Sequence, residues 1–259
     1  MVTLPSLFVS HGAPSLILDN DATTAFFRKL GAKYQKPDGI VCISAHWESP
    51  QLLLTANPQR ETIYDFYGFP QPLYEITYPG TGSTGLVEQV TTALNTGNLS
   101  VKVNDKRGFD HGVWVPLKLM YPNADIPIVQ LSVLPRESAS YHYEIGQALG
   151  SLREQNILIF ASGSATHNLS EFRRQTKDAE PLDYAVAFDQ WLVEKIESGD
   201  RQSLLNYANV APEAQRNHPT PEHFLPLFVA LGAATASTGK RIHKGFTYGA
   251  LSMAAFEWN

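Results

Sequence analysis

The sequence predicts a single α/β domain spanning residues 1–259, with a central, mainly parallel sheet flanked by helices. Short runs of apolar and β-branched residues alternate with longer amphipathic segments, which is typical of a parallel sheet covered on both faces. With 259 residues, of which 43% are hydrophobic and 17% charged, the chain can bury one large core. No internal repeat, low-complexity tract or linker divides the chain, so we expect one domain.

Five apolar runs have the length and composition of buried strands. Leu4–Ser10 (LPSLFVS) ends at a polar residue, and Gly39–Ala45 (GIVCISA) is rich in β-branched residues. Ile126–Leu134 (IPIVQLSVL) and Ile157–Ser162 (ILIFAS) have the same character. Phe246–Phe256 (FTYGALSMAAF) is less regular because it contains Gly and Ala, and we interpret it as a last strand.

Five longer segments have the spacing of apolar residues that one buried helix face requires. They lie between the predicted strands, as the helices of a parallel sheet do. These segments are Thr23–Tyr34, Gly85–Leu94, Tyr141–Gln155, Asp183–Ser198 and Glu222–Leu231.

The segment Asn57–Pro79 interrupts this alternation. It is rich in proline and aromatic residues and repeats with neither the helical nor the strand period. A long irregular segment in a compact domain is often a binding loop or lid, and a packed surface loop is the alternative. We expect this segment to help to cover a site.

Composition and charge exclude several classes of function. The formal net charge is -5 and no Lys/Arg cluster is present, so we expect no nucleic-acid partner. Cys42 is the only cysteine, which excludes an internal disulfide and a Cys-rich zinc site. The first residues lack the pattern of a signal peptide, and no apolar run has the length of a membrane span. We therefore expect a cytoplasmic protein without a membrane partner, and nothing in the sequence indicates its oligomeric state.

Three histidines follow predicted strands. His11 comes after the first strand, His46 after the second, and His167 lies shortly after Ile157–Ser162. The carboxyl ends of parallel strands meet at one edge of the sheet, so these imidazoles could converge there. Neutral imidazole is a common metal ligand, and without thiolates the site would contain histidine with or without carboxylate.

Further histidines lie in predicted loops. His111 has glycines nearby in GFDHGVW, which permit close backbone approach. His218 and His223 belong to HPTPEH, where two prolines stiffen the chain before an apolar helix. Any one of these side chains could be a hydrogen-bonded structural residue. Their combination with the strand-end histidines favours a metal site.

Five motifs in a fixed order connect these histidines with a known family. The motifs are SHGAP at 10–14, SAHWE at 44–48, GFDHG at 108–112, GSATHN at 163–168 and HPTPEH at 218–223. Together they resemble the class III extradiol ring-cleaving dioxygenases, specifically the DOPA 4,5-dioxygenase branch related to the LigB superfamily. The resemblance extends over nearly the whole chain. It implies a single α/β domain and one divalent metal ion per chain.

The resemblance also implies a ligand set. His11 and His46 match the first two metal ligands of the family, and His223 matches the third ligand of a three-histidine site. Glu222 and His218 remain alternatives for the third position, because relatives with two histidines and one carboxylate use a glutamate.

His167 matches the catalytic histidine of the family, and His111 resembles a second active-site histidine near the oxygen-binding position. The implied reaction opens a catechol such as DOPA with O2 to give a semialdehyde. A facial triad on Fe(II) leaves open positions for both reactants, and a nearby imidazole can remove and return a proton. Fe(II) is the implied metal for activity. Zn(II) could occupy the same three imidazoles but has no accessible redox change.

Two other functions compete with this interpretation. A zinc-dependent hydrolase would need a base, for which Glu48, two residues after His46, is the candidate. A non-enzymatic binding protein is the other alternative, since Memo proteins share the superfamily fold. The complete set of five histidines favours the dioxygenase.

Substrate identity is less accessible. No Arg or Lys stands out as the partner of a substrate carboxylate. Four aromatic residues could form walls around a flat ring, with ordinary packing as the alternative: Trp47, Phe69, Trp114 and Tyr248.

Overall fold

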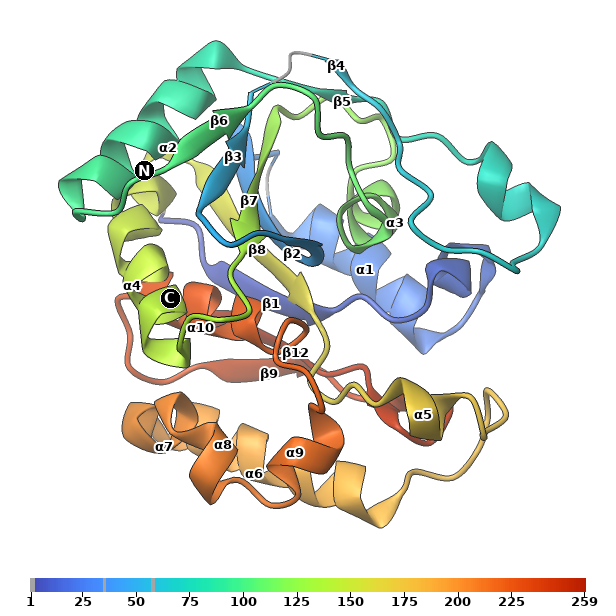
Figure 1. Ribbon diagram of the computed structural model, residues 1–259. Helices are drawn as coiled ribbons and strands as arrows, with labels where there is room; N and C mark the ends of the chain where they lie inside the picture. Colours follow the sequence, from blue (N-terminus) through green and yellow to red (C-terminus); the bar gives the residue numbers. More distant parts are fainter. Residues whose placement is uncertain (1–2, 35, 57–58) are drawn as a thin grey trace.

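The computed structural model describes residues 3–34, 36–56 and 59–259, and their centre is a parallel sheet (Figure 1). In the eight-stranded sheet the order is β6-β3-β7-β2-β8-β1-β12-β9. Its four central strands are mutually parallel, as the sequence predicts. They are β1 (Ser6–Ser10), β2 (Gly39–Glu48), β7 (Ile128–Val133) and β8 (Ile157–Gly163).

Both edges of the sheet include antiparallel pairs. On one side β3 (Leu53–Thr55) runs antiparallel to β7 and parallel to β6 (Lys102–Asn104). On the other, β12 (Ala255–Trp258) pairs antiparallel with β1 and with β9 (Lys240–His243). The sheet is therefore parallel in its centre and mixed at its edges.

Helices cover both faces of the sheet (Figure 1). One face packs against α1 (Ala22–Lys33) and α3 (His111–Met120). The other packs against α2 (Thr84–Thr96), α4 (Ala139–Leu149), α6 (Asp183–Ser198) and α10 (Leu225–Ala233). Shorter helices complete this layer and the connections: η1 (Pro14–Leu18), η2 (Gln71–Glu75), η3 (Gly150–Gln155), α5 (Leu169–Phe172), α7 (Arg201–Leu205), α8 (Tyr207–Val210) and α9 (Ala214–Asn217).

The central strands lie between two hydrophobic layers. In β2, Ile40 and Cys42 pack with the cluster that contains α1 and α3, whereas Val41 and Ile43 pack with the cluster that contains α2, α4 and α10. Because both faces are covered, these strands are nearly continuous apolar runs rather than alternating ones. This explains why short apolar runs identify them in the sequence.

Helix starts follow local capping chemistry. The Asp21 carboxylate accepts hydrogen bonds from two backbone N–H groups of α1, and Thr24 completes a capping box. The hydroxyls of Ser83 and Ser138 cap α2 and α4 in the same way. The helix predicted over Asp183–Ser198 has the bounds of α6.

Four predicted elements either differ from the structure by more than two residues at one end or are divided. The predicted strand Gly39–Ala45 extends to Glu48. Tyr141–Gln155 is two helices, α4 and η3, and the helix predicted from Glu222 begins only at Leu225 after a turn.

The predicted last strand, Phe246–Phe256, was also wrong as one element. It is divided among β10 (Phe246–Thr247), β11 (Leu251–Ser252) and the start of β12. Tyr248 and Gly249 have left-handed φ values of 50° and 58°, and this conformation reverses the chain between β10 and β11.

Helix α3 was not predicted, and His111 was expected in a loop. Nine of its ten residues are buried, so the segment shows little of the polar–apolar periodicity that identifies a surface helix. Pro116 also lies inside it. Among the described residues, no helix is both long and apolar enough to cross a membrane.

Candidate active site

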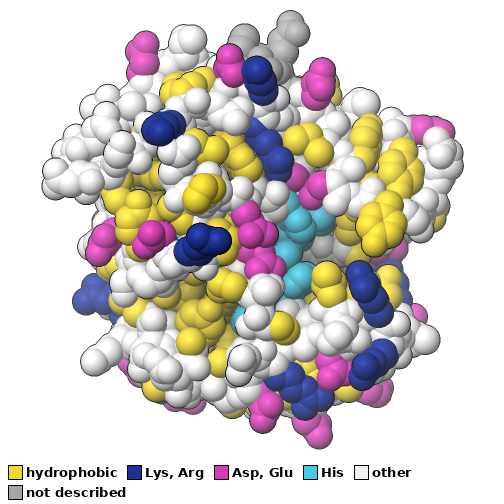
Figure 2. Space-filling model, viewed as in Figure 1, with side chains coloured by type: hydrophobic (Ala, Val, Ile, Leu, Met, Phe, Trp, Pro, Cys, Tyr) yellow, Lys and Arg dark blue, Asp and Glu magenta, His cyan; other side chains and the backbone are white. Residues whose placement is uncertain are grey.

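The five predicted site histidines line one cavity of about 410 Å³ at the carboxyl edge of the central strands. Figure 2 shows histidine side chains at the bottom of a hollow in the surface. His11 directly follows β1, and His167 lies four residues after β8. His223 lies in the turn before α10. The sheet and the turn before α10 thus bring together residues that are up to 212 positions apart in sequence.

Two of the five histidines are placed differently from the prediction. His46 belongs to β2 itself, because this strand continues past the predicted end. His111 is the first residue of α3 rather than part of a loop. The backbone there approaches β2 closely: a Cβ on Gly112 would lie 2.4 Å from the Ser44 hydroxyl. The glycine after His111 is therefore required by this close packing.

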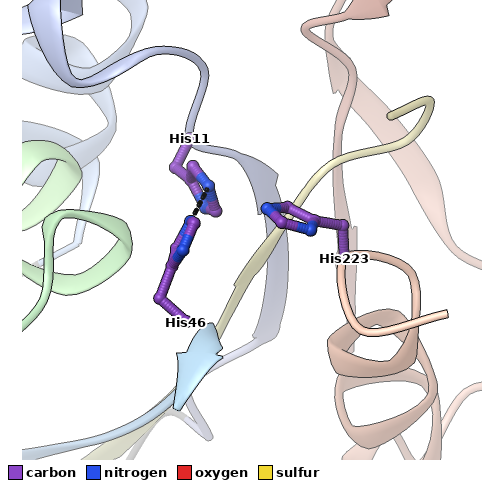
Figure 3. Close-up of side chains that lie close together, drawn as sticks. All are labelled: His11, His46 and His223. Carbon is purple, nitrogen blue, oxygen red and sulfur yellow. Dashed lines mark hydrogen bonds between the residues drawn. The ribbon is translucent and has the colours of Figure 1, made fainter. Parts of the chain in front are cut away.

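His11, His46 and His223 form the candidate metal centre (Figure 3). One ring nitrogen from each lies within 4.8 Å of those of the other two. The Nε2 atoms of His11 and His46 are 3.0 Å apart. Figure 3 shows the His223 ring pointing toward this pair from the opposite side.

Hydrogen bonds to the Nδ1 atoms determine which ring nitrogens carry protons. The Ser162 hydroxyl donates to the Gly112 carbonyl, so its oxygen accepts from His11 Nδ1–H at 2.9 Å. The carboxylate of Glu222 accepts from His223 Nδ1–H at 2.9 Å. A neutral imidazole holds one proton, so the Nε2 atoms of both rings are unprotonated.

This donor set fits a divalent metal. His46 turns its Nδ1 toward the Asp65 carboxylate at 3.4 Å, which favours the proton on that side and leaves Nε2 as a lone pair. Two Nε2 lone pairs that face each other at 3.0 Å repel unless a cation lies between them. Three neutral imidazoles with carboxylate or hydroxyl partners behind them are typical of a protein metal site.

The acid–base properties of the rings agree with this fit. Burial, together with the neighbouring imidazoles, lowers the pKa of His11 and of His223 well below the usual value. For the same reasons the pKa of His46 falls to about 4. The three rings are therefore neutral near pH 7, the state in which imidazole coordinates metals.

Asp65, which the sequence analysis did not single out, is the carboxylate behind two of the histidines. It accepts hydrogen bonds from the backbone N–H of His111 at 3.0 Å and from its Nδ1–H at 2.9 Å. Burial opposes ionisation of Asp65, but the bond to His111 outweighs it and lowers the pKa to about 2. Its only signal in the sequence is its position as an acidic residue within the aromatic segment Asn57–Pro79.

A second carboxylate, Asp110, is fully buried and fixes the backbone around His46. Asp110 accepts from the Ser44 hydroxyl at 2.6 Å, from the Gln130 amide at 2.7 Å and from Arg107 at 3.1 Å. The same Arg107 nitrogen donates to the His46 carbonyl at 2.9 Å. This network ties the His46 backbone in β2 to β7 and to the start of α3.

His167 lies outside the group of His11, His46 and His223, although it forms a second candidate group with Glu222 and His223. Its ring stacks on that of His223, with centroids 3.5 Å apart and an interplanar angle of 9°. Asn168 holds the loop in place, because its side chain caps α5 and donates to the Arg216 carbonyl at 2.7 Å.

The alternative ligands lie in different surroundings. His218 directs Nε2 to the Ala165 carbonyl at 3.0 Å and stacks on Phe224, outside the metal groups of the described residues. Glu222 lies close enough to join a group with His167 and His223, but its nearest contact is the Nδ1–H of His223. Glu48 is exposed and does not line the cavity, so the base expected for a hydrolase is not in position.

The aromatic segment contributes to the cavity as predicted. Phe66, Tyr67 and Phe69 line it, while residues 57–58 of the predicted segment lie outside the described residues. Of the four aromatic wall candidates, only Phe69 is in place.

The other three candidates do not line this cavity. Trp47 is buried beside Arg107, and Trp114 is buried in the core with its Nε1–H donating to the Ile63 carbonyl. Tyr248 lines a different cavity. The cavity wall also includes Leu169, Phe172 and Leu251, which were not predicted. Their position in the wall depends on packing between segments that are distant in the sequence.

Comparisons with known proteins agree with this site. Residues 6–256 match the family described as "Catalytic LigB subunit of aromatic ring-opening dioxygenase". A 4,5-DOPA dioxygenase extradiol from Beta vulgaris is 40% identical over 260 residues, covering 98% of this chain and 96% of the relative. The protein of the same name from Escherichia coli (strain K12) is 36% identical and covers 98% and 94%.

A solved structure supports the same assignment. The crystal structure of an uncharacterized protein from Escherichia coli K12 superposes with a TM-score of 0.81 at 33% identity, covering 98% of this chain and 99% of that one. Both the family match and the relatives extend over nearly the whole chain. The chain therefore belongs to the LigB family and is an aromatic ring-opening dioxygenase.

Proposed function

We propose that this protein is an extradiol dioxygenase that opens the ring of a catechol such as DOPA, using O2 and one metal ion held by His11, His46 and His223. The observation that carries the proposal is the convergence of three unprotonated Nε2 atoms on one point of the cavity. Bound Fe(II) would supply Lewis acidity toward a catechol hydroxyl and the redox change that reaction with O2 requires. Zn(II) would fit the same donors without that redox change.

His167 is the proposed acid–base residue. Among the described residues its ring nitrogens form no hydrogen bond, so they are free to meet a substrate hydroxyl in the cavity that they line. Burial, reinforced by neighbouring imidazoles, lowers its pKa to about 3. The ring is therefore neutral near pH 7, which is the form that can accept a catechol proton.

His111 is proposed to bind and orient rather than to transfer this proton. Asp65 holds its Nδ1–H, which leaves the Nε2 lone pair directed away from that carboxylate. The ring centroid lies 4.0 Å from that of His46, so His111 forms one wall beside the metal group. Phe66 and Phe69 would exclude water from this side once an aromatic ring is bound.

Anaerobic reconstitution tests the proposal. Metal-free protein loaded with one equivalent of Fe(II) is expected to convert DOPA or 4-methylcatechol, after addition of O2, to a yellow ring-opened product. O2 consumption should equal the product formed, and the Zn(II)-loaded protein should form none. Full Fe(II) loading without ring opening of either catechol would refute the proposed function.

A further inference from the structure

One basic side chain lines the cavity above the histidines. Arg173 follows α5, six residues after His167, and its backbone N–H donates to the Leu169 carbonyl at 3.2 Å. The other lining residues within the described chain are apolar or aromatic, together with glycine, one serine and the five histidines. Figure 2 shows basic, acidic and hydrophobic side chains beside the hollow that contains the histidines. Arg173 is therefore the residue that gives this cavity lining a positive charge while the histidines are neutral.

Two other basic residues of this region, Lys177 and Arg216, differ from Arg173 because carboxylates neutralise them. Lys177 Nζ lies 2.7 Å from Asp19, and Arg216 lies 3.1 Å from Glu171. Arg173 takes part in none of the ion pairs or side-chain hydrogen bonds within the described part of the chain. Its guanidinium is thus available to an anion from solution, and its planar fork matches a carboxylate.

The cavity itself restricts which anion fits. Phe66, Phe69 and Phe172 supply aromatic surface, and a volume of about 410 Å³ holds a single substituted ring. A catechol whose hydroxyls reach the histidines directs its ring substituent away from them. A carboxylate on that substituent would meet Arg173, whereas an ammonium group would meet a like charge.

We propose that Arg173 binds a carboxylate on the substrate side chain, so that the cavity selects catechols with an anionic tail over neutral or cationic ones. This inference rests on the proposed function, because it specifies the substrate class of the same cavity. Arg173 is a specificity residue and takes no part in proton transfer.

Steady-state kinetics of the Fe(II)-loaded enzyme test this selection. The substrates are 3-(3,4-dihydroxyphenyl)propionate, 4-methylcatechol and dopamine, which carry an anionic, a neutral and a cationic substituent. Arg173→Gln is expected to raise KM for the propionate by up to about tenfold with little change in kcat, as for the loss of a charge-assisted bond at an exposed site. KM for 4-methylcatechol should change far less, and Arg173→Glu should lower KM for dopamine. Arg174→Gln is the matched control, since Arg174 is also exposed but does not line the cavity.

An equal rise in KM for the propionate and 4-methylcatechol, or no rise for either, would overturn the proposal. Calorimetry on Zn(II)-loaded protein tests the carboxylate site independently of the proposed function, because it measures binding affinity and needs no ring opening. The probes are 3-(4-hydroxyphenyl)propionate and 4-ethylphenol. Tighter binding of the propionate that disappears in Arg173→Gln supports the carboxylate site even if no catechol is opened. Ring opening by the wild type without that preference would leave the proposed function intact and refute the role of Arg173.

Discussion

Replacing Asp65 by Asn is expected to weaken metal binding and to slow turnover without unfolding the protein. The carboxylate accepts the backbone N–H and the Nδ1–H of His111 at 3.0 and 2.9 Å and lies 3.4 Å from His46 Nδ1. In the amide, one oxygen becomes an NH2 group, which cannot accept from either ring. The ring that loses its acceptor is then free to rotate or to change tautomer.

The magnitude follows from these contacts. Loss of a partner behind a metal-binding histidine typically lowers metal affinity by about 10- to 100-fold. Of the two histidines beside Asp65, only His46 is a proposed metal ligand. Its 3.4 Å contact with Asp65 is longer than an ordinary hydrogen bond. We therefore expect the lower end of this range, a loss of about tenfold or about 1.4 kcal/mol. Turnover should fall as well, because His111 loses its anchor.

Competition with a chromophoric chelator measures Zn(II) affinity, and thermal unfolding of the metal-free proteins checks that the variant is folded. Glu61→Gln is the matched control, since Glu61 is an exposed acid only four residues away. Wild-type metal affinity and turnover in a folded Asp65→Asn variant would refute the orienting role of this carboxylate.

Three other predictions concern the histidines. His223→Ala should abolish stoichiometric metal in elemental analysis, whereas His218→Ala should retain it because that Nε2 is bonded to a carbonyl; the reverse pattern would contradict the ligand assignment. His167→Ala should keep its metal and its affinity for catechol but lose about 10²- to 10⁴-fold in turnover with Fe(II), with a smaller loss for His111→Ala. Metal loss in His167→Ala would instead make this residue a ligand. Burial lowers the pKa of His142 from 6.5 to about 4. As the pH falls, the His142 ring is therefore protonated at a higher pH in the unfolded protein than in the folded one. The free energy of unfolding should therefore decrease by roughly 3 kcal/mol between about pH 6.5 and pH 4 from this group. Denaturant titrations of His142→Gln should show a smaller decrease, and an equal decrease would disprove the assignment.

Local patterns in the sequence were sufficient for the central sheet. Buried parallel strands are short apolar runs because helices cover both of their faces, and amphipathic helices carry their own period. Four of the central strands and the helix Asp183–Ser198 were predicted on this basis. The position of His11 directly after a strand also indicated the edge at which a site would form, because the carboxyl ends of parallel strands lie together.

Segments without a local period could not be predicted. Helix α3 is buried on nearly all sides, so its sequence contains no polar face. The turn at Tyr248 and Gly249 depends on left-handed backbone conformations that the apolar composition of Phe246–Phe256 conceals. In both cases the surrounding structure, rather than local preference, determines the conformation.

The central sheet and the set of histidines can therefore be read from the sequence alone, whereas the hydrogen-bond partners of these histidines depend on the tertiary structure. The Ser162 acceptor of His11 is 151 residues away, and the Asp65 acceptor of His111 is 46 residues away. Arg173 likewise joins the cavity with Phe66 from a distant segment. A hydrogen bond or a shared cavity between such segments depends on the three-dimensional packing of whole elements, and spacing along the chain contains no record of it.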